Sequence, residues 1–291
     1  MKALQFFLAA LALATFSGCL QIEKLVKLKP DGSGTIEETL VMSKETVASL
    51  QKFTEGMAAQ TAPATNPDEK PGKKKKKATT PAPAAFSLLD ESKLKAEAEK
   101  MGEGVKFVSA TKINDDKSDG YKAIFSFTDI NKVKLDQNPG STMPSPGGKG
   151  ANEGPNGKSK KEPLTFHFTK GSPGELTISM PQPDAKAPPA QPQTGETLDM
   201  AVQAMRQIFK DMKVTIAVEV QGTIQETNAE YHDASRVTLV SVDFNKLVEN
   251  PDKLKTLAQQ NPQTLQASKA LLKDLDGVKL ESSPEVKVKF Q

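Results

Sequence analysis

The chain has 291 residues, a formal net charge of +3, no tryptophan and a single cysteine. So small a net charge argues against nucleic acid as a partner, and the scarcity of aromatic side chains argues against stacking surfaces for bases or sugars. One cysteine cannot form an internal disulfide, so stability must come from apolar burial. A chain of this length can supply that burial in one or two domains.

Residues 1–18 have the pattern of a bacterial lipoprotein signal peptide. Lys2 precedes an apolar run over residues 4–16, which is shorter than the ~20 residues that a membrane-spanning helix needs. Small Ser17 and Gly18 then lead to Cys19, as in a lipobox, although Phe16 stands where leucine is usual. The alternative is an ordinary secretory signal followed by an incidental cysteine.

Lipidation at Cys19 predicts where the protein is placed in the cell. Acyl chains such as palmitate contribute about 0.8 kcal/mol per buried methylene, so two or three of them would hold the chain on a membrane. Leu20 follows the cysteine, whereas aspartate there retains lipoproteins in the inner membrane of enteric bacteria. We therefore expect an extracytoplasmic protein anchored in the cell envelope, in the outer membrane rather than the inner.

Three segments, 61–83, 138–163 and 181–194, are rich in Pro, Gly, Ala, Ser, Thr, Gln or Lys. Such compositions cannot bury enough apolar surface to offset the entropy of ordering, which predicts long disordered insertions. The third segment reads as a linker between an N-terminal α+β region over 19–180 and a C-terminal α+β region over 195–291. The two regions form one domain if the N-terminal hairpin pairs with C-terminal strands.

The first predicted elements are a hairpin and two helices. Alternating residues over 20–29 and 36–42 flank the turn sequence Asp31-Gly32-Ser33-Gly34, which predicts two antiparallel strands. Ser43 is a candidate N-cap for a helix that carries Val47, Leu50 and Phe53. A second helix is expected over 92–101, because glycines at 102 and 104 would end it.

The rest of the chain predicts further strands and helices. Apolar residues recur at helical spacing over 198–212 and again from Asn261. Period-two alternation predicts one strand that begins at residue 105. It predicts further strands over residues 121–127, 164–168, 176–180, 214–220, 237–244 and 286–290. The predicted fold class is α+β, with antiparallel hairpins forming one or two twisted sheets covered by helices on one face.

No residue pattern predicts a metal, a cofactor or a catalytic centre. His167 alternates with two phenylalanines and should lie on the opposite face, His232 lies in a predicted turn, and neither has partners at zinc-ligand spacing. Asp115, Asp116 and Asp119 resemble the start of a calcium loop, but no glutamate follows at the twelfth position, so a hairpin turn is expected. A hydrolase that uses an unrecognised Asp/Glu pair remains an alternative.

A run of five lysines is the second candidate site. It could contact an anionic membrane surface, where each lysine contributes about 1 kcal/mol. The alternative is a solvated charge run that keeps the insertion soluble. The run consists of Lys73, Lys74, Lys75, Lys76 and Lys77.

Two turn motifs carry a resemblance to a known family. These are the Asp-Gly-Ser-Gly-Thr hairpin over residues 31–35 and the sequence Gly-Thr-Ile-Gln-Glu-Thr-Asn over residues 222–228, which leads to a valine-rich strand. Over residues 19–45 and 213–245 the chain resembles the LppM-type lipoprotein domain of mycobacteria. The resemblance implies a mixed α/β envelope module with lipid or glycolipid contact, and it implies no catalytic residues.

The function expected from the sequence is that of a non-enzymatic binding or scaffolding module of the cell envelope, held by the lipid on Cys19. Its partner would be an envelope protein, a lipid or a glycan. A lipid carrier with an apolar cavity is the main alternative.

Overall fold

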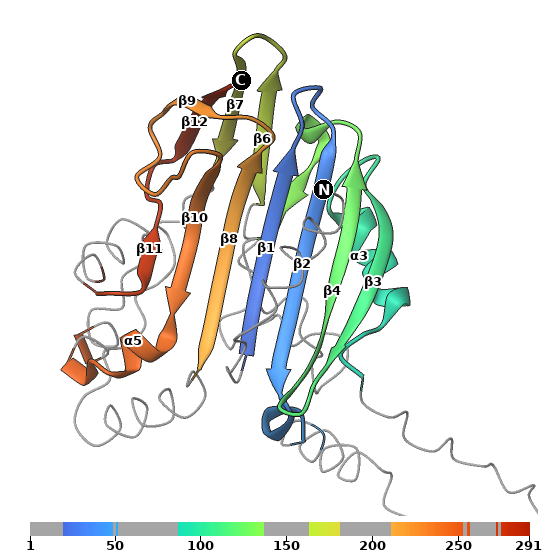
Figure 1. The fold of residues 1–291 in the computed structure, drawn as a ribbon, viewed down its shortest axis with the longest axis vertical. Helices are drawn as coiled ribbons and strands as arrows, with labels where there is room; N and C mark the ends of the chain where they lie inside the picture. The colour runs from blue at the N-terminus through green and yellow to red at the C-terminus, as the bar shows by residue number, and fades with distance from the viewer. Residues whose placement is uncertain are drawn as a thin grey trace, which may run out of the picture.

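The computed structural model describes residues 20–48, 51, 87–136, 163–180, 211–252, 255–256, 272 and 275–291. Within these residues the chain forms two β-sheets and a few short helical segments (Figure 1). In spatial order, the seven-stranded sheet contains β11 (Val278–Leu280), β10 (Arg236–Asp243), β8 (Met212–Val220), β1 (Leu20–Leu28), β2 (Gly34–Ser43), β4 (Ser118–Phe127) and β3 (Lys106–Asn114). The five-stranded sheet contains β5 (Lys134–Leu135), β6 (Leu164–Thr169), β7 (Gly174–Ser179), β12 (Glu285–Phe290) and β9 (Ile224–Thr227).

One hydrophobic core joins the two sheets. Alternate residues of β1, β2, β4 and β8 turn toward it from the large sheet, and alternate residues of β6, β7 and β12 turn toward it from the small sheet. The rings of Phe168 and Phe290 stack at 5.8 Å between centroids inside the small-sheet half of this core. Period-two burial on one face of each sheet therefore produces a sheet-on-sheet packing.

The predicted α+β fold class was wrong, because the layer that covers the large sheet is a second β-sheet and not a layer of helices. Helices were expected to cover the sheet, but the described chain is mostly β and its helices are short. The physical reason lies in strands such as β6, where Leu164, Phe166 and Phe168 are buried and the residues between them are exposed. Strands with one apolar face must bury it, and here they bury it against the apolar face of the large sheet.

The described helices are α3 (Glu91–Lys100), the 3-10 helix η2 (Ile130–Lys132) and α5 (Phe244–Val248), and residues 44–48, 51, 251–252, 255–256 and 272 are also helical. The helix expected over 92–101 is confirmed as α3. Asp90 caps it by accepting hydrogen bonds from the backbone N–H groups of Ser92 and Lys93. The helices predicted over 198–212 and from Asn261 fall almost entirely outside the described residues.

Strands from distant parts of the chain lie side by side in both sheets. β1 pairs with β2 in the predicted antiparallel hairpin and with β8 in parallel, so that Leu20 lies opposite both Met42 and Met212. β12 lies between β7 and β9 in the small sheet. Each sheet thus combines strands from both sides of residues 181–194. The predicted insertions over 61–83, 138–163 and 181–194 lie outside the described residues, apart from Pro163.

Asparagine side chains extend the short outer strands of the small sheet. Asn131 accepts a hydrogen bond from the backbone N–H of Phe168 at 2.7 Å, beside the two-residue strand β5. Asn228 accepts one from the backbone N–H of Lys287 at 2.6 Å and donates to the carbonyl of Glu285 at 3.0 Å, just after β9. Because an amide carries one donor and one acceptor side by side, it can replace a missing backbone partner at a sheet edge.

Candidate functional site

The end of the large sheet at which β1 begins is the first candidate region. Leu20, the first residue of β1, directly follows Cys19, which lies outside the described residues. β1 and β8 begin at this end, and β2 and β10 finish there (Figure 1). We call residues 20, 42–48, 115–118, 211–213 and 243–249 the tether end.

Two caps fix the chain on one side of the tether end. The hydroxyl oxygen of Ser43 accepts a hydrogen bond from the backbone N–H of Thr46 at 3.2 Å, which confirms Ser43 as the predicted N-cap. The carboxylate of Asp115 accepts from the backbone N–H groups of Lys117 and Ser118 at 2.8 and 2.7 Å. The backbone N–H of Lys44 donates to the carbonyl of Lys117 at 2.9 Å, so the start of the helix is bonded to the β3–β4 turn.

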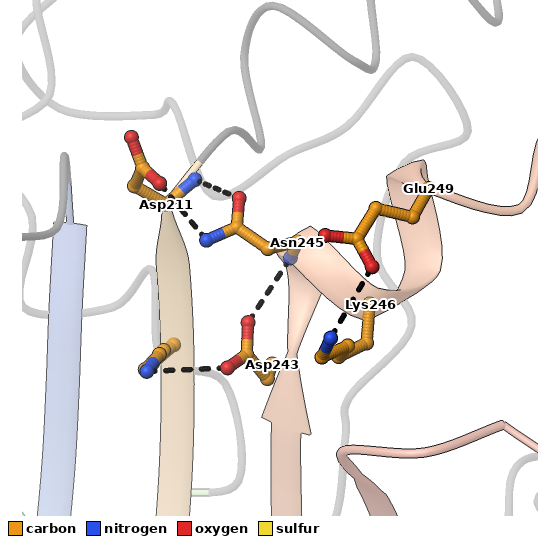
Figure 2. A network of polar contacts seen from close by, with 6 residues as sticks. Asp211, Asp243, Asn245, Lys246 and Glu249 are labelled. Atoms are coloured by element: carbon orange, nitrogen blue, oxygen red, sulfur yellow. Dashed lines mark hydrogen bonds and ion pairs between the residues drawn. The ribbon is translucent and has the colours of Figure 1, made fainter.

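On the other side of the tether end, the side chain of Asn245 in α5 binds Asp211, the residue directly before β8 (Figure 2). The side-chain oxygen of Asn245 accepts from the backbone N–H of Asp211 at 2.8 Å, and its side-chain NH2 donates to the Asp211 carboxylate at 2.9 Å. Asp211 has a φ of +59°, a conformation that aspartate tolerates better than most residues. The paired hydrogen bonds stabilise that conformation.

The same network balances the charges around α5. Asp243 accepts from the backbone N–H of Asn245 at 3.1 Å as the N-cap of α5, and its second oxygen lies 3.1 Å from the Lys213 ammonium. Lys246 and Glu249 are in contact at 3.3 Å on the exposed side of the helix (Figure 2). The described charges around α5 are therefore largely matched to one another.

The second candidate region is a cluster of charges buried in the core of the large sheet. Lys24 of β1 and Glu38 of β2 are only 2% and 0% exposed and lie opposite each other in the hairpin register. The Lys24 ammonium lies 3.1 Å from Oε2 of Glu38, and the phenol of Tyr121 donates to Oε1 at 2.9 Å. No other hydrogen-bond partner reaches Oε2 among the described residues, so that oxygen depends on the charge of Lys24.

Helix α3 brings a second carboxylate to the same lysine. Glu97 Oε1 lies 3.6 Å from the Lys24 ammonium, and the Glu97 side chain is 22% exposed. Burial and the charge of Glu38 raise the pKa of Glu97 to about 7, against the opposing influence of Lys24. Burial opposes the charge of Lys24, but Glu38 and Glu97 outweigh it and raise the pKa of the lysine.

This cluster can take up and release a proton near neutral pH. Two carboxylates share one ammonium, and Tyr121 supports only one of them. Burial, followed by the charge of Glu38, raises the pKa of the Tyr121 phenol far above its usual value, so the phenol remains a donor. Glu97 is therefore the member of the cluster whose charge changes near neutral pH.

Comparison with known proteins gives one distant structural resemblance. No protein-family model matches the sequence, and no curated protein matches it. The NMR structure of the folded domain of the Mycobacterium tuberculosis LppM protein is similar at a TM-score of 0.26 and 12% identity. The match covers 78% of this chain and 84% of that chain. The resemblance to the LppM-type domain inferred from the turn motifs is thus distant.

The site residues proposed from the sequence, Cys19 and Lys73–Lys77, lie outside the part of the chain that the structure describes. His167 is exposed on β6 between two buried phenylalanines, as predicted, and His232 is exposed in the turn before β10. In the part of the chain that the structure describes, no group of acidic, histidine or cysteine side chains could hold a metal ion, and no helix is long and apolar enough to span a bilayer.

Sequence reasoning missed the buried cluster, although the sequence carries a signal for it. Lys24 falls in phase with the buried residues Ile22 and Val26, and Glu38 falls in phase with Ile36 and Leu40. A charged residue at a core position of each strand of one predicted hairpin indicates a buried ion pair, provided that the register brings the two together.

Proposed function

We propose that the chain is an extracytoplasmic lipoprotein, anchored through acylated Cys19, whose two-sheet body acts as a non-enzymatic binding or scaffolding module of the cell envelope. The observation that carries this proposal is the lipobox sequence that ends at Cys19, directly before the first residue of β1. A thiol in this position is the group that accepts the lipid.

The position of β1 determines how such an anchor would orient the body. No linker separates the lipidated residue from the sheet, so the tether end would lie against the bilayer. β1 has nine residues, and a strand rises ~3.3 Å per residue, so its far end lies roughly 27 Å from the tether end. The β1–β2 turn at that far end would be presented to an envelope partner.

The lysine run fits a location on the membrane side. The chain leaves the described fold after residues 44–51, which follow β2 at the tether end, and Lys73–Lys77 lie in the segment that comes next. Contact of these lysines with an anionic surface would add to the anchoring by the lipid. This contact is part of the proposal.

A binding role agrees with the contacts that the buried carboxylates and the histidines make in the described fold. The two carboxylates that converge in the core, those of Glu38 and Glu97, are engaged by Lys24, and the two histidines lie on separate elements. These carboxylates are therefore engaged in contacts within the body. We infer that the partner is an envelope protein, lipid or glycan that binds to the surface of the body.

Incorporation of labelled palmitate tests the anchor. The wild-type chain, expressed in a bacterium with lipoprotein-processing enzymes, should incorporate label and enter the detergent phase on phase separation, whereas a Cys19→Ser variant should do neither. Separation of inner and outer membranes should then place the wild type in the outer membrane. A wild-type chain that takes up no label and stays in the aqueous phase would contradict the proposal.

Binding to vesicles tests the lysine run separately. The Cys19→Ser chain with Lys73–Lys77 intact should bind vesicles of anionic phospholipid, and the same chain with all five lysines changed to glutamine should bind less. Vesicles of zwitterionic phospholipid are the control and should bind both chains weakly. Equal binding of the two chains to anionic vesicles would remove the lysine run from the proposal and leave the lipid anchor intact.

A further inference from the structure

Helix α3 is attached to the core by a few apolar side chains, by its buried C-cap Met101, whose carbonyl accepts from the backbone N–H of Lys134, and by one charged side chain. Only Leu94 and Ala98 of the helix are buried, and the helix packs beside β3 at the edge of the large sheet. Glu97 lies between these residues in sequence and points toward the buried cluster. Such an apolar contact stabilises the docking of α3 only modestly. The protonation state of the Glu97 carboxyl therefore has a large influence on that docking.

Each element packed around Glu97 contributes a charged or polar group. Lys24 of β1 attracts its carboxylate, Glu38 of β2 repels it, and the Tyr121 phenol of β4 donates a hydrogen bond to Glu38. On α3 itself, Lys100 attracts the Glu97 carboxylate.

Asp136, which follows β5, acts on the same cluster by favouring the charged form of Lys24. Glu38 lies 3.1 Å from the Lys24 ammonium and accepts a hydrogen bond from Tyr121, so Lys24 already has one carboxyl partner. An ionised Glu97 would therefore add an unmatched negative charge to a largely buried site, which is costly in a medium of low dielectric constant.

We propose that α3 is a proton-dependent latch, which docks firmly on the sheet when the Glu97 carboxyl is protonated and loosens when that carboxyl ionises. In the docked state the neutral carboxyl removes the repulsion with Glu38. In the loosened state the carboxylate is hydrated, and the core residues beneath Leu94 and Ala98 become accessible. The latch is independent of the proposed lipid anchor, because all of its parts lie in the described body.

The direction of the pH effect follows from the two states of Glu97. Docking raises its pKa from the ordinary 4.5 to about 7. A carboxyl whose pKa is raised in the docked state favours docking fully below its ordinary pKa, and this contribution is lost as the pH rises through 7. Docking of α3 should therefore weaken by about tenfold between pH 6 and pH 8.

Amide hydrogen exchange of the full chain in detergent micelles, followed by mass spectrometry, tests the latch. After correction for the intrinsic pH dependence of exchange, peptides that cover 91–100 should lose about tenfold in protection between pH 6 and pH 8, while peptides of β1 and β2 should not change. In a Glu97→Gln variant, protection of α3 should be the same at both values of pH. The matched control is Glu99→Gln, an exposed glutamate on the same helix, which should behave as the wild type.

The proposal is overturned if wild-type α3 is equally protected at pH 6 and pH 8, or if the Glu97→Gln variant keeps the wild-type difference. A second measurement serves if the variant does not fold. The carboxyl carbon of Glu97 in the 13C-labelled wild-type chain should titrate near pH 7, and titration at the ordinary value of a glutamate would reject the latch.

Discussion

Lys24 lies directly opposite Glu38 in the β1–β2 hairpin, and the contact between Nζ and Oε2, 3.1 Å long, is shielded from water. A slip of one residue in this register would turn one of the two charges away from the other and separate Glu38 from its counter-charge. Buried ion pairs contribute little net stability, because desolvation offsets the attraction. The pair therefore acts mainly to select the register of the hairpin.

Removal of one member of this pair should destabilise the fold strongly. A Lys24→Met variant leaves Glu38 buried without its cation, and breaking such pairs costs about 3–5 kcal/mol. The free energy of unfolding from urea denaturation measures this loss. A Lys24→Met/Glu38→Leu double variant should recover much of it, because neither charge remains.

Lys27 provides the control for that experiment. It lies on the same strand but on the outer face, where its half-exposed side chain contacts Glu37 at 2.7 Å. A Lys27→Met change should cost less than about 1 kcal/mol, as for other exposed pairs. Equal losses for Lys24→Met and Lys27→Met would contradict the role assigned to the buried pair.

Tyr121 should stay protonated for as long as the protein remains folded. Burial and Glu38 raise its pKa, so its neutral phenol stabilises the folded state below the ordinary pKa of tyrosine, and this contribution is lost as the pH rises above that value. The chain has two tyrosines, so a Tyr231→Phe variant reports Tyr121 alone. Absorbance of the tyrosinate ion in this variant should increase only together with the loss of β-sheet circular dichroism.

A gradual increase in that absorbance, while the circular dichroism still shows a folded protein, would contradict the bond between Tyr121 and Glu38. A Tyr121→Phe variant in the same background should show no tyrosinate signal at any pH, which checks the assignment.

Glu281 should be essential for stability despite its place in a loop. It is 1% exposed, and its carboxylate accepts three backbone hydrogen bonds, from Glu230 at 2.8 Å and from Ser282 and Ser283 at 2.9 Å each. A Glu281→Ala variant would leave these donors without that acceptor, at a cost of about 2–4 kcal/mol. Thermal unfolding should show a clear decrease in the midpoint, and Glu285→Ala, at an exposed residue of β12, should show almost none.

The edges of the small sheet should promote aggregation when the asparagines that cover them are replaced. An Asn131→Ala/Asn228→Ala variant exposes backbone groups of β6 and β12 that the amides now engage. We expect a loss of about 1 kcal/mol for each hydrogen-bonded amide and an increase in light scattering at high protein concentration. Asn114→Ala, at the exposed end of β3, is the control and should change neither. Unchanged scattering of the double variant would show that the amides do not protect these edges.

Local patterns predicted most of the strands. The alternation in β4, where Tyr121, Ala123 and Phe125 are all buried, was visible in the sequence, as were the hairpins β1–β2 and β6–β7. The short strands β5, β9 and β11 were missed, because two to four residues are too few for a period to be recognised. The candidate anchor at Cys19 also came from local sequence, since signal peptides are recognised before folding.

The sequence by itself determined which residues of longer strands such as β4 and β6 face a core, because side chains alternate along any strand. It also determined the local cap at Ser43, because a cap needs only the residues that follow it. Only the tertiary structure decided that a second sheet covers the first, that β1 lies beside β8, and that Glu97 reaches Lys24. These are contacts between residues far apart in the chain, and their energies depend on distance in space, which local periodicity does not encode.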